Sequence, residues 1–142
     1  MRPVYLLDTN IISELARPRP DKAVVDMFFH NIHRSAVPAV AWGECLYGLK
    51  RIPDSRRRQV LTDFYMNTVL DALPFMPFDE HAASIYSDIK SRLQKAGRPA
   101  PELDMQIASV AIANNMILVT RSVGDFEGIA SVSGLMLENW FS

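Results

Sequence analysis

Four acidic side chains of this chain occupy positions from which they could do chemistry together: Asp8, Glu44, Asp104 and Asp125. Asp8 is the clearest, because it directly follows the apolar run 4–7, which has the length of a buried strand. In α/β proteins the active site lies at the carboxyl ends of such strands. Carboxylates held close together repel one another, and a divalent cation is the usual reason to gather them. If the four converge, they favour metal-dependent phosphoryl transfer.

Asp8 also has a structural alternative, because Asp is a favoured N-cap and a helix is expected to begin near Asn10. Thr9 or Asn10 could fill that capping role as well. A carboxylate at the end of a buried strand, followed by a hydroxyl and an amide side chain, favours a functional role for Asp8.

Glu44 is the only charged residue between positions 39 and 49. On a helix its neighbours three and four residues away are apolar or glycine, which leaves little room for a solvated charge. Buried glutamates are rare unless they are paired or bind a metal. The alternative to metal binding is an ion pair with Arg51 or Arg121.

Asp104 shares one face of an expected helix with four apolar residues: Ile107, Ala108, Ala111 and Ile112. It therefore points with the core-facing side, close to the helix start. The alternative is a first-turn acid that stabilises the helix dipole, but Glu102 would serve equally well and would sit more naturally in solvent.

Asp125 belongs to the segment 120–126, which has turn chemistry throughout. It could contribute to the site or simply cap a short helix. Ser122 in the same segment is a candidate contact for a phosphate or for a metal-bound water.

Apolar runs, prolines and capping residues predict strands and helices in alternation. We expect strands at 4–7, 35–37, 117–120 and 135–138, and a short edge strand within 73–78, where two prolines interrupt the run. We expect helices at 10–16, 21–30, 39–50, 55–69, 79–96 and 102–114, with a turn or short helical piece at 124–128. This alternation predicts an α/β fold whose mostly parallel sheet has helices on both faces.

Composition narrows the function further. A length of 142 residues favours one domain, and a net charge of −1 provides no global basic field for nucleic acid. Two local basic patches are present: Arg17 with Arg19, and Arg51 with the arginines at 56–58, although the second patch could be a solvated helix face.

The single cysteine, Cys45, is expected to be a buried inert thiol. Without a signal-peptide core or a membrane span, the sequence predicts a cytoplasmic protein.

Several other chemistries lack their motifs. The three histidines have no zinc-ligand spacing, and there is no Gly-rich phosphate or dinucleotide loop. A haloacid-dehalogenase-like phosphatase needs a second Asp two residues after the first, where this chain has Asn10.

The order and spacing of these motifs resemble the PIN domain. The resemblance rests on four stretches of the chain. They are residues 6–10, Glu44 in the expected helix after residues 37–38, residues 104–108, and residues 118–121 followed by residues 125–126. It extends over nearly the whole chain and is to the small single-domain ribonucleases of the VapC toxin type, including the FitB-like branch. It implies one PIN domain over 1–142, folded as a three-layer α/β/α sandwich.

The resemblance also implies site residues and a cofactor. Asp8 and Asp104 would be the main ligands of Mg²⁺ or Mn²⁺, with Glu44 completing the metal site and Asp125 as the fourth catalytic acid. In the family the last motif commonly reads Thr-Arg-Asn-x-x-Asp-Phe, and here Ser122 stands in the Asn position. Whether Ser122 or Asp125 fills the fourth position therefore stays open.

The implied function is the ribonuclease toxin of a type II toxin–antitoxin system. Hydrolysis with a metal-activated water needs no 2′-hydroxyl, so products with a 5′-phosphate and a 3′-hydroxyl are expected. The resemblance further implies a homodimer and a cognate VapB-type antitoxin, through which alone DNA would be contacted. Basic residues and Tyr47 or Trp42 could bind the RNA. The alternatives are a non-catalytic PIN-fold module that binds RNA or protein, and a housekeeping PIN-type RNA-processing nuclease.

Overall fold

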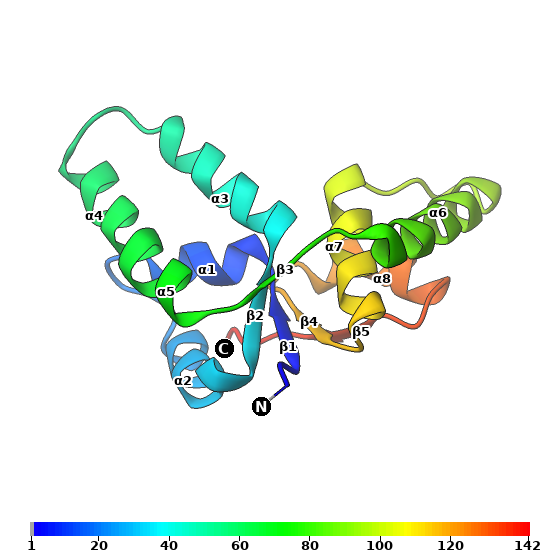
Figure 1. The fold of residues 1–142 in the computed structure, drawn as a ribbon, viewed down its shortest axis with the longest axis horizontal. Helices are drawn as coiled ribbons and strands as arrows, with labels where there is room; N and C mark the ends of the chain where they lie inside the picture. Colours follow the sequence, from blue (N-terminus) through cyan, green and yellow to red (C-terminus); the bar gives the residue numbers. More distant parts are fainter. Residues whose placement is uncertain (1) are drawn as a thin grey trace.

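The computed structural model describes residues 2–142 and contains a five-stranded sheet in the order β3-β2-β1-β4-β5 (Figure 1). The strands are β1 (Tyr5–Leu7), β2 (Ser35–Pro38), β3 (Phe75–Met76), β4 (Ile117–Val119) and β5 (Met136–Glu138). Every pair of neighbouring strands is parallel. The predicted α/β class and parallel sheet are confirmed, and β3 is an edge strand as expected from its prolines.

Helices connect the strands. They are α1 (Thr9–Leu15), α2 (Lys22–Asn31), α3 (Ala39–Lys50), α4 (Arg56–Phe64), α5 (Leu70–Ala72), α6 (Glu80–Lys95), α7 (Glu102–Ala113) and α8 (Val123–Ser131), with a 3₁₀ turn η1 (Ile32–Arg34) and a π-helical segment η2 (Tyr65–Val69). Asp21, Ser55 and Asp79 each accept a hydrogen bond from a backbone N–H of the helix that follows. Local capping chemistry therefore determines where α2, α4 and α6 begin.

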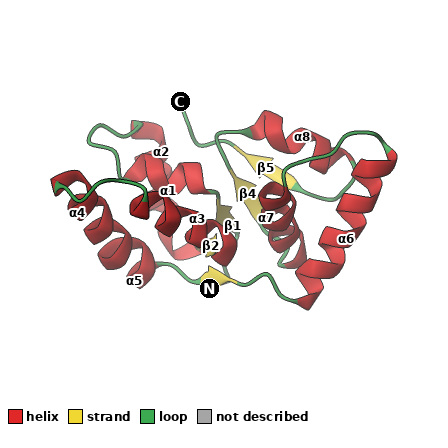
Figure 2. Cartoon of the chain, turned by 90° about the horizontal axis from the view of Figure 1, so that it is seen from above, coloured by secondary structure: helices red, strands yellow, loops and turns green. Residues whose placement is uncertain are grey.

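The two faces of the sheet pack against different helices, because side chains alternate along each strand. Leu6 and Leu118 pack with buried residues of α6, α7 and α8. Leu7 and Val119 pack with buried residues of α1, α2 and η2. Figure 2 shows the strands between these two groups of helices. The result is the expected three-layer α/β/α sandwich.

Two elements differ from the sequence-based expectation. The helix expected at 55–69 changes to π-helical geometry at η2, where Tyr65 and Val69 turn into the core. The short piece expected at 124–128 is the longer helix α8, because Phe126 and Ile129 are fully buried against the sheet. In both places tertiary packing overrides weak local signals.

Two expectations from composition can also be compared with the structure. Cys45 is a buried free cysteine, and burial is the main reason that the pKa of its thiol rises to about 12. It is therefore a poor nucleophile, as expected. Among residues 2–142, no helix has the length and apolarity needed to cross a membrane.

The carboxyl edge of the sheet collects the starts of several segments. Asp8 follows β1 and Thr120 follows β4, and the backbone N–H of Asp8 donates to the carbonyl of Val119 at 3.0 Å. Helix α3 starts directly after β2. Helix α7 precedes β4 and runs back along the sheet, so its first turn, with Asp104, lies at the same edge. A site at this edge can therefore draw on β1, α3, α7 and the segment after β4.

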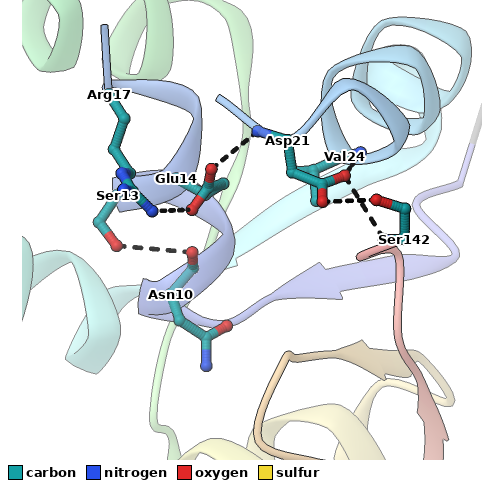
Figure 3. Close-up of polar contacts among 7 residues, drawn as sticks. All are labelled: Asn10, Ser13, Glu14, Arg17, Asp21, Val24 and Ser142. Carbon is teal, nitrogen blue, oxygen red and sulfur yellow. Dashed lines mark hydrogen bonds and ion pairs between the residues drawn. The ribbon is translucent and has the colours of Figure 1, made fainter. Parts of the chain in front are cut away.

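Glu14 stabilises the connection between α1 and α2 (Figure 3). Its buried carboxylate accepts hydrogen bonds from the backbone N–H of Asp21 at 2.8 Å and from Arg17 at 3.1 Å. Asp21 in turn caps α2 and accepts a hydrogen bond from the hydroxyl of Ser142 at 2.7 Å. Glu14 therefore has a structural role, and it connects α1, the start of α2 and the end of the described chain.

We expect Glu14→Ala to lower the free energy of unfolding by about 2 kcal/mol, because it removes a buried carboxylate that accepts from the backbone N–H of Asp21 and from Arg17. Urea unfolding of the purified protein measures this loss. Glu127→Ala is the matched control, since Glu127 is exposed and its truncation should change stability by less than about 0.5 kcal/mol. Equal stability of the two variants would contradict the role assigned to Glu14.

Candidate active site

The buried carboxylate of Asp8 is held by donors from two segments. It is 6% exposed. One of its oxygens accepts from the backbone N–H of Thr9 at 2.8 Å, and the other accepts from the hydroxyl of Thr120 at 2.9 Å. Asp8 is also the N-cap of α1, so the structural alternative and the candidate functional role fall on the same side chain.

Opposing effects act on the pKa of Asp8. Burial is the largest effect and raises the pKa, because a desolvated carboxylate is costly. Hydrogen bonds from Thr120 and Thr9 lower it, and the negative charge of Asp125 raises it slightly. The net shift is upward, so ionised Asp8 is stabilised less here than it would be in water.

Asp104 lies in the first turn of α7 and is half-buried. Its pKa is raised to about 6, first by burial and then by the negative charges of Asp8 and Asp125. This coupling means that the fold brings Asp8, Asp104 and Asp125 into one negative field. Glu102 in the same turn is exposed and pairs with Lys90 at 2.7 Å, so the two first-turn acids have the different environments that the sequence predicts.

Asp125 lies in the first turn of α8 and is exposed. The N-cap of α8 is Ser122, whose carbonyl accepts from the backbone N–H of Asp125 at 3.0 Å. The alternative of Asp125 as a helix cap is therefore wrong. Its carboxylate is left to act on Asp8 and Asp104 through charge.

Glu44 differs from the sequence-based expectation, because its side chain is exposed. The buried face of α3 consists of Ala41, Cys45 and Leu49, and Glu44 lies beside that face. The ion pairs found among residues 2–142 are Arg17–Glu14 and Lys90–Glu102, so an arginine partner for Glu44 is not seen there. Of its neighbours three and four residues away, Ala41 is buried in the core, whereas Gly48 lines a groove that Glu44 also lines.

This groove has a volume of about 1000 Å³. It lies between α1, α3, α4 and η2, and Leu103 at the start of α7 also lines it. Its apolar lining includes Cys45, Leu49, Ile52, Val60, Leu61 and Tyr65. Glu44 and Thr9 line it too, and Thr9 contacts Asp8. The groove therefore includes Glu44 and adjoins Asp8 through Thr9.

The structure adds one residue that the sequence reasoning did not single out. Thr120 is fully buried and donates directly to Asp8. Its signal in the sequence was its position at the end of the apolar run 117–120, at the same sheet edge as Asp8. Asn10, the amide side chain that follows Asp8 in the sequence, donates to Thr120 and Ser122.

The donor chemistry of Asp8 and Asp104 fits a hard cation. Their oxygens are anionic, and their mutual repulsion would be relieved by positive charge. Mg²⁺ usually binds one or two carboxylates and keeps several waters. Among residues 2–142, however, no three Asp, Glu, His or Cys side chains are arranged to enclose a metal. The two aspartates suffice for Mg²⁺, and the ligand set of Asp8, Asp104 and Glu44 stays a prediction.

Sequence comparison identifies the family. The model of the PIN domain matches residues 5–126, so this chain belongs to the PIN-domain family. It is 32% identical over 127 residues to VapC ribonuclease Y4jK of Sinorhizobium fredii, covering 87% of this chain and 91% of the relative. It is 30% identical over 129 residues to Toxin FitB of Neisseria gonorrhoeae, with the same coverage of each chain.

Solved structures give the same assignment. A chain of FitAcB from Neisseria gonorrhoeae superposes with a TM-score of 0.85 and 27% identity, covering 96% of this chain and 97% of that one. A chain of VapBC2 from Rickettsia felis, determined bound to a DNA fragment from its promoter, gives 0.81 and 25%, covering 99% of each chain. The resemblance stated from the sequence is therefore confirmed.

Replacing Asp104 tests whether its ionisation opposes folding. The folded chain holds this proton up to about pH 6, whereas an ordinary carboxyl releases it near 3.8, so the contribution of Asp104 to stability should fall as pH rises between these values. Asp104→Asn should therefore be more stable than wild type at pH 7.5, by on the order of 1 kcal/mol after allowing for solvent screening. Urea unfolding at pH 7.5 and pH 4 measures the difference, which should vanish at the lower pH.

Glu102→Gln is the matched control for this measurement. It removes an exposed acid from the same helical turn, and that acid has a favourable partner in Lys90. It should give no gain in stability at pH 7.5. A destabilised Asp104→Asn protein at that pH would show that Asp104 is not repelled in the folded chain.

Proposed function

We propose that this chain is a Mg²⁺-dependent ribonuclease that acts as the toxin of a toxin–antitoxin pair. The observation that carries the proposal is that Asp8, Asp104 and Asp125 share one negative field. Burial, and after it the charges of Asp8 and Asp125, raise the pKa of Asp104 to about 6. Such a field opposes folding unless a cation balances it. Two relatives, aligned over 87% of this chain, are named as a ribonuclease and a toxin, which supports the reaction and the role.

In this proposal Asp8 and Asp104 hold Mg²⁺ or Mn²⁺, with Glu44 contributing from α3. A bound Mg²⁺ supplies charge stabilisation at the scissile phosphate and lowers the pKa of a water. Thr9 and Thr120 fix the orientation of Asp8 by hydrogen bonds to its two oxygens. Asp125, at the exposed side of the site, adds negative charge that strengthens cation binding. The expected products carry a 5′-phosphate and a 3′-hydroxyl.

The groove offers contacts for RNA beside these carboxylates. Arg17 and Arg57 line it and can pair with phosphates. Tyr47 is 57% exposed and has Arg51 over its ring at 5.7 Å, so it can stack on a base. Trp42 packs against aromatic side chains of the core and is the weaker stacking candidate.

We also propose that the groove binds a segment of a VapB-type antitoxin. Its lining is largely apolar, which suits one face of an amphipathic helix. An arginine of the antitoxin next to Glu44 would balance the negative charge that a metal otherwise balances. Solved relatives include a VapBC2 structure bound to promoter DNA, which supports DNA contact through the antitoxin. The homodimer stays an expectation from the family resemblance.

Replacing Asp8 tests the catalytic proposal. Asp8→Asn should lower RNA cleavage by at least about 100-fold, because it removes the central anionic ligand while keeping an N-capping side chain. Purified chain is incubated with mixed RNA and Mg²⁺ or Mn²⁺, and new 5′ ends are sequenced after ligation that requires a 5′-phosphate. Asp21→Asn is the matched control, since Asp21 is also an N-cap but belongs to α2. A fully active Asp8→Asn protein would exclude this mechanism.

The same preparation separates the alternatives. A non-catalytic PIN module would bind no Mn²⁺ in calorimetry and would leave RNA intact even as wild type. A housekeeping nuclease would cleave RNA, but its brief expression would not arrest growth in an Asp8-dependent manner.

Binding of an antitoxin in the groove is tested by a substitution that keeps the core intact. Val60 lines the groove and is 52% exposed, so Val60→Arg should preserve folding and place a charge against an apolar partner face. Co-purification with the product of the adjacent gene should weaken by about tenfold or more. Leu70→Arg is the control, because Leu70 is 46% exposed but belongs to α5, outside the groove lining. Equal retention of the partner by both variants would place the antitoxin elsewhere.

A further inference from the structure

Asn10 connects the first turn of α1 to the segment that follows β4. Its side-chain nitrogen donates to the hydroxyl oxygens of Thr120 and Ser122, each at 3.2 Å. Its side-chain oxygen accepts from the backbone N–H of Arg121 at 3.1 Å. In Figure 3 the amide of Asn10 points away from the Glu14–Asp21 contacts at the other end of α1. All three hydrogen bonds therefore lie at the carboxyl edge of the sheet, where Asp8 is located.

The orientation of this amide is fixed by its partners. The backbone N–H of Arg121 can only donate, so it must face the oxygen of Asn10. The nitrogen of Asn10 must then face the two hydroxyls. A rotated amide would lose the hydrogen bond from Arg121 and would turn an acceptor instead of a donor toward the two hydroxyls.

Asn10 also fixes the direction in which the hydroxyl of Thr120 donates. This hydroxyl receives hydrogen bonds from two groups that are donors only, the amide nitrogen of Asn10 and the backbone N–H of Ser122 at 3.0 Å. Its single hydrogen is therefore left for Asp8, at 2.9 Å. Thr120 is fully buried, so water does not offer this hydrogen another acceptor.

The effect on Ser122 is different. Its hydroxyl oxygen accepts from Asn10, whereas its own hydrogen has no acceptor among residues 2–142. Ser122 is half-buried and is the N-cap of α8, the helix that carries Asp125. A hydroxyl held in this way can donate to an anionic oxygen of a substrate.

We propose that Asn10 is a positioning residue, which makes Thr120 an obligate donor to Asp8 and holds the Ser122 hydroxyl ready to donate to a phosphate oxygen. The fixed direction of the hydrogen bond from Thr120 to Asp8 follows from the hydrogen bonds alone. The phosphate oxygen as acceptor rests on the proposed function. Asn10 would affect the reaction without touching the reacting atoms.

The experiment compares Asn10→Asp and Asn10→Ala with wild type. Asn10→Asp keeps the shape but cannot donate, so the hydroxyl of Thr120 gains a competing acceptor. Asn10→Ala removes all three hydrogen bonds. Asn67→Asp is the matched control. Asn67 is exposed on η2, so this substitution makes the same change in charge away from the site. Stability of each variant is checked by thermal unfolding, so that all kinetics are measured well below the transition.

Two measurements decide the outcome. Both Asn10 variants should lower kcat for RNA cleavage by about 10- to 100-fold while KM changes less than about threefold, as expected for a group that orients a ligand. Hydrogen exchange, followed by NMR without metal, should accelerate by about tenfold or more at the amide of Arg121 in Asn10→Ala, which removes the acceptor of that N–H. Wild-type kcat in either variant, or unchanged exchange at Arg121 in Asn10→Ala, would overturn the proposal.

Failure of the proposed ribonuclease function and failure of the positioning role of Asn10 would give different results. A wild-type chain that cleaves no RNA contradicts the proposed function, and that result is read without any Asn10 variant. The exchange measurement still decides the role of Asn10 in that case, because it needs neither RNA nor metal. Its signature would be faster exchange at Arg121 in Asn10→Ala. Neither Asn10→Asp, whose carboxylate still accepts from that N–H, nor Asn67→Asp should show this change.

Discussion

The buried carboxylate of Asp8 is the constraint on which the rest of the site depends. A parallel sheet with β1 between β2 and β4 puts the end of β1 at the centre of the carboxyl edge, beside the end of β4. Burial there raises the pKa of Asp8, and hydrogen bonds from Thr120 and Thr9 oppose that rise. The charge of Asp8 in turn raises the pKa of Asp104. The topology thus creates one unfavourable charge, and the neighbouring residues are arranged around it.

Much of the fold could be predicted because its signals are local. Asp21, Ser55 and Asp79 cap the helices that they were expected to begin, and α3 has the predicted bounds between Pro38 and Pro53. The exposure of Glu44 could not be predicted in this way. The helix α3 is apolar nearly all round, so the sequence does not reveal which of its faces meets the core. The face through Ala41, Cys45 and Leu49 does, and Cys45 and Leu49 also line the groove beside Glu44.

The contacts that organise the site also could not be predicted from the sequence, because they join segments that are distant along the chain. Asn10 and Thr120 are separated by 110 residues, yet their hydrogen bond determines how Thr120 meets Asp8. The sequence identified Asp8 and Asp125 as acids that follow strands of a parallel sheet, and Asp104 as an acid on the core-facing side of a helix. It could not identify the uncharged Thr120, because a threonine at the end of an apolar run is also an ordinary strand residue. Uncharged residues that orient a charge become visible only when the partners of that charge are known.

An apolar groove that ends at uncompensated carboxylates has two unfavourable features in the free chain. Apolar surface such as Val60 is exposed to water, and the charges of Asp8 and Asp104 repel each other. A cation relieves only the repulsion, and an apolar peptide covers only the groove. A partner helix that ends in a cation relieves both, so its binding can stabilise the fold more than metal alone. In the proposed function, catalysis and inhibition therefore depend on the same negative field, and whatever occupies it determines whether the site is active.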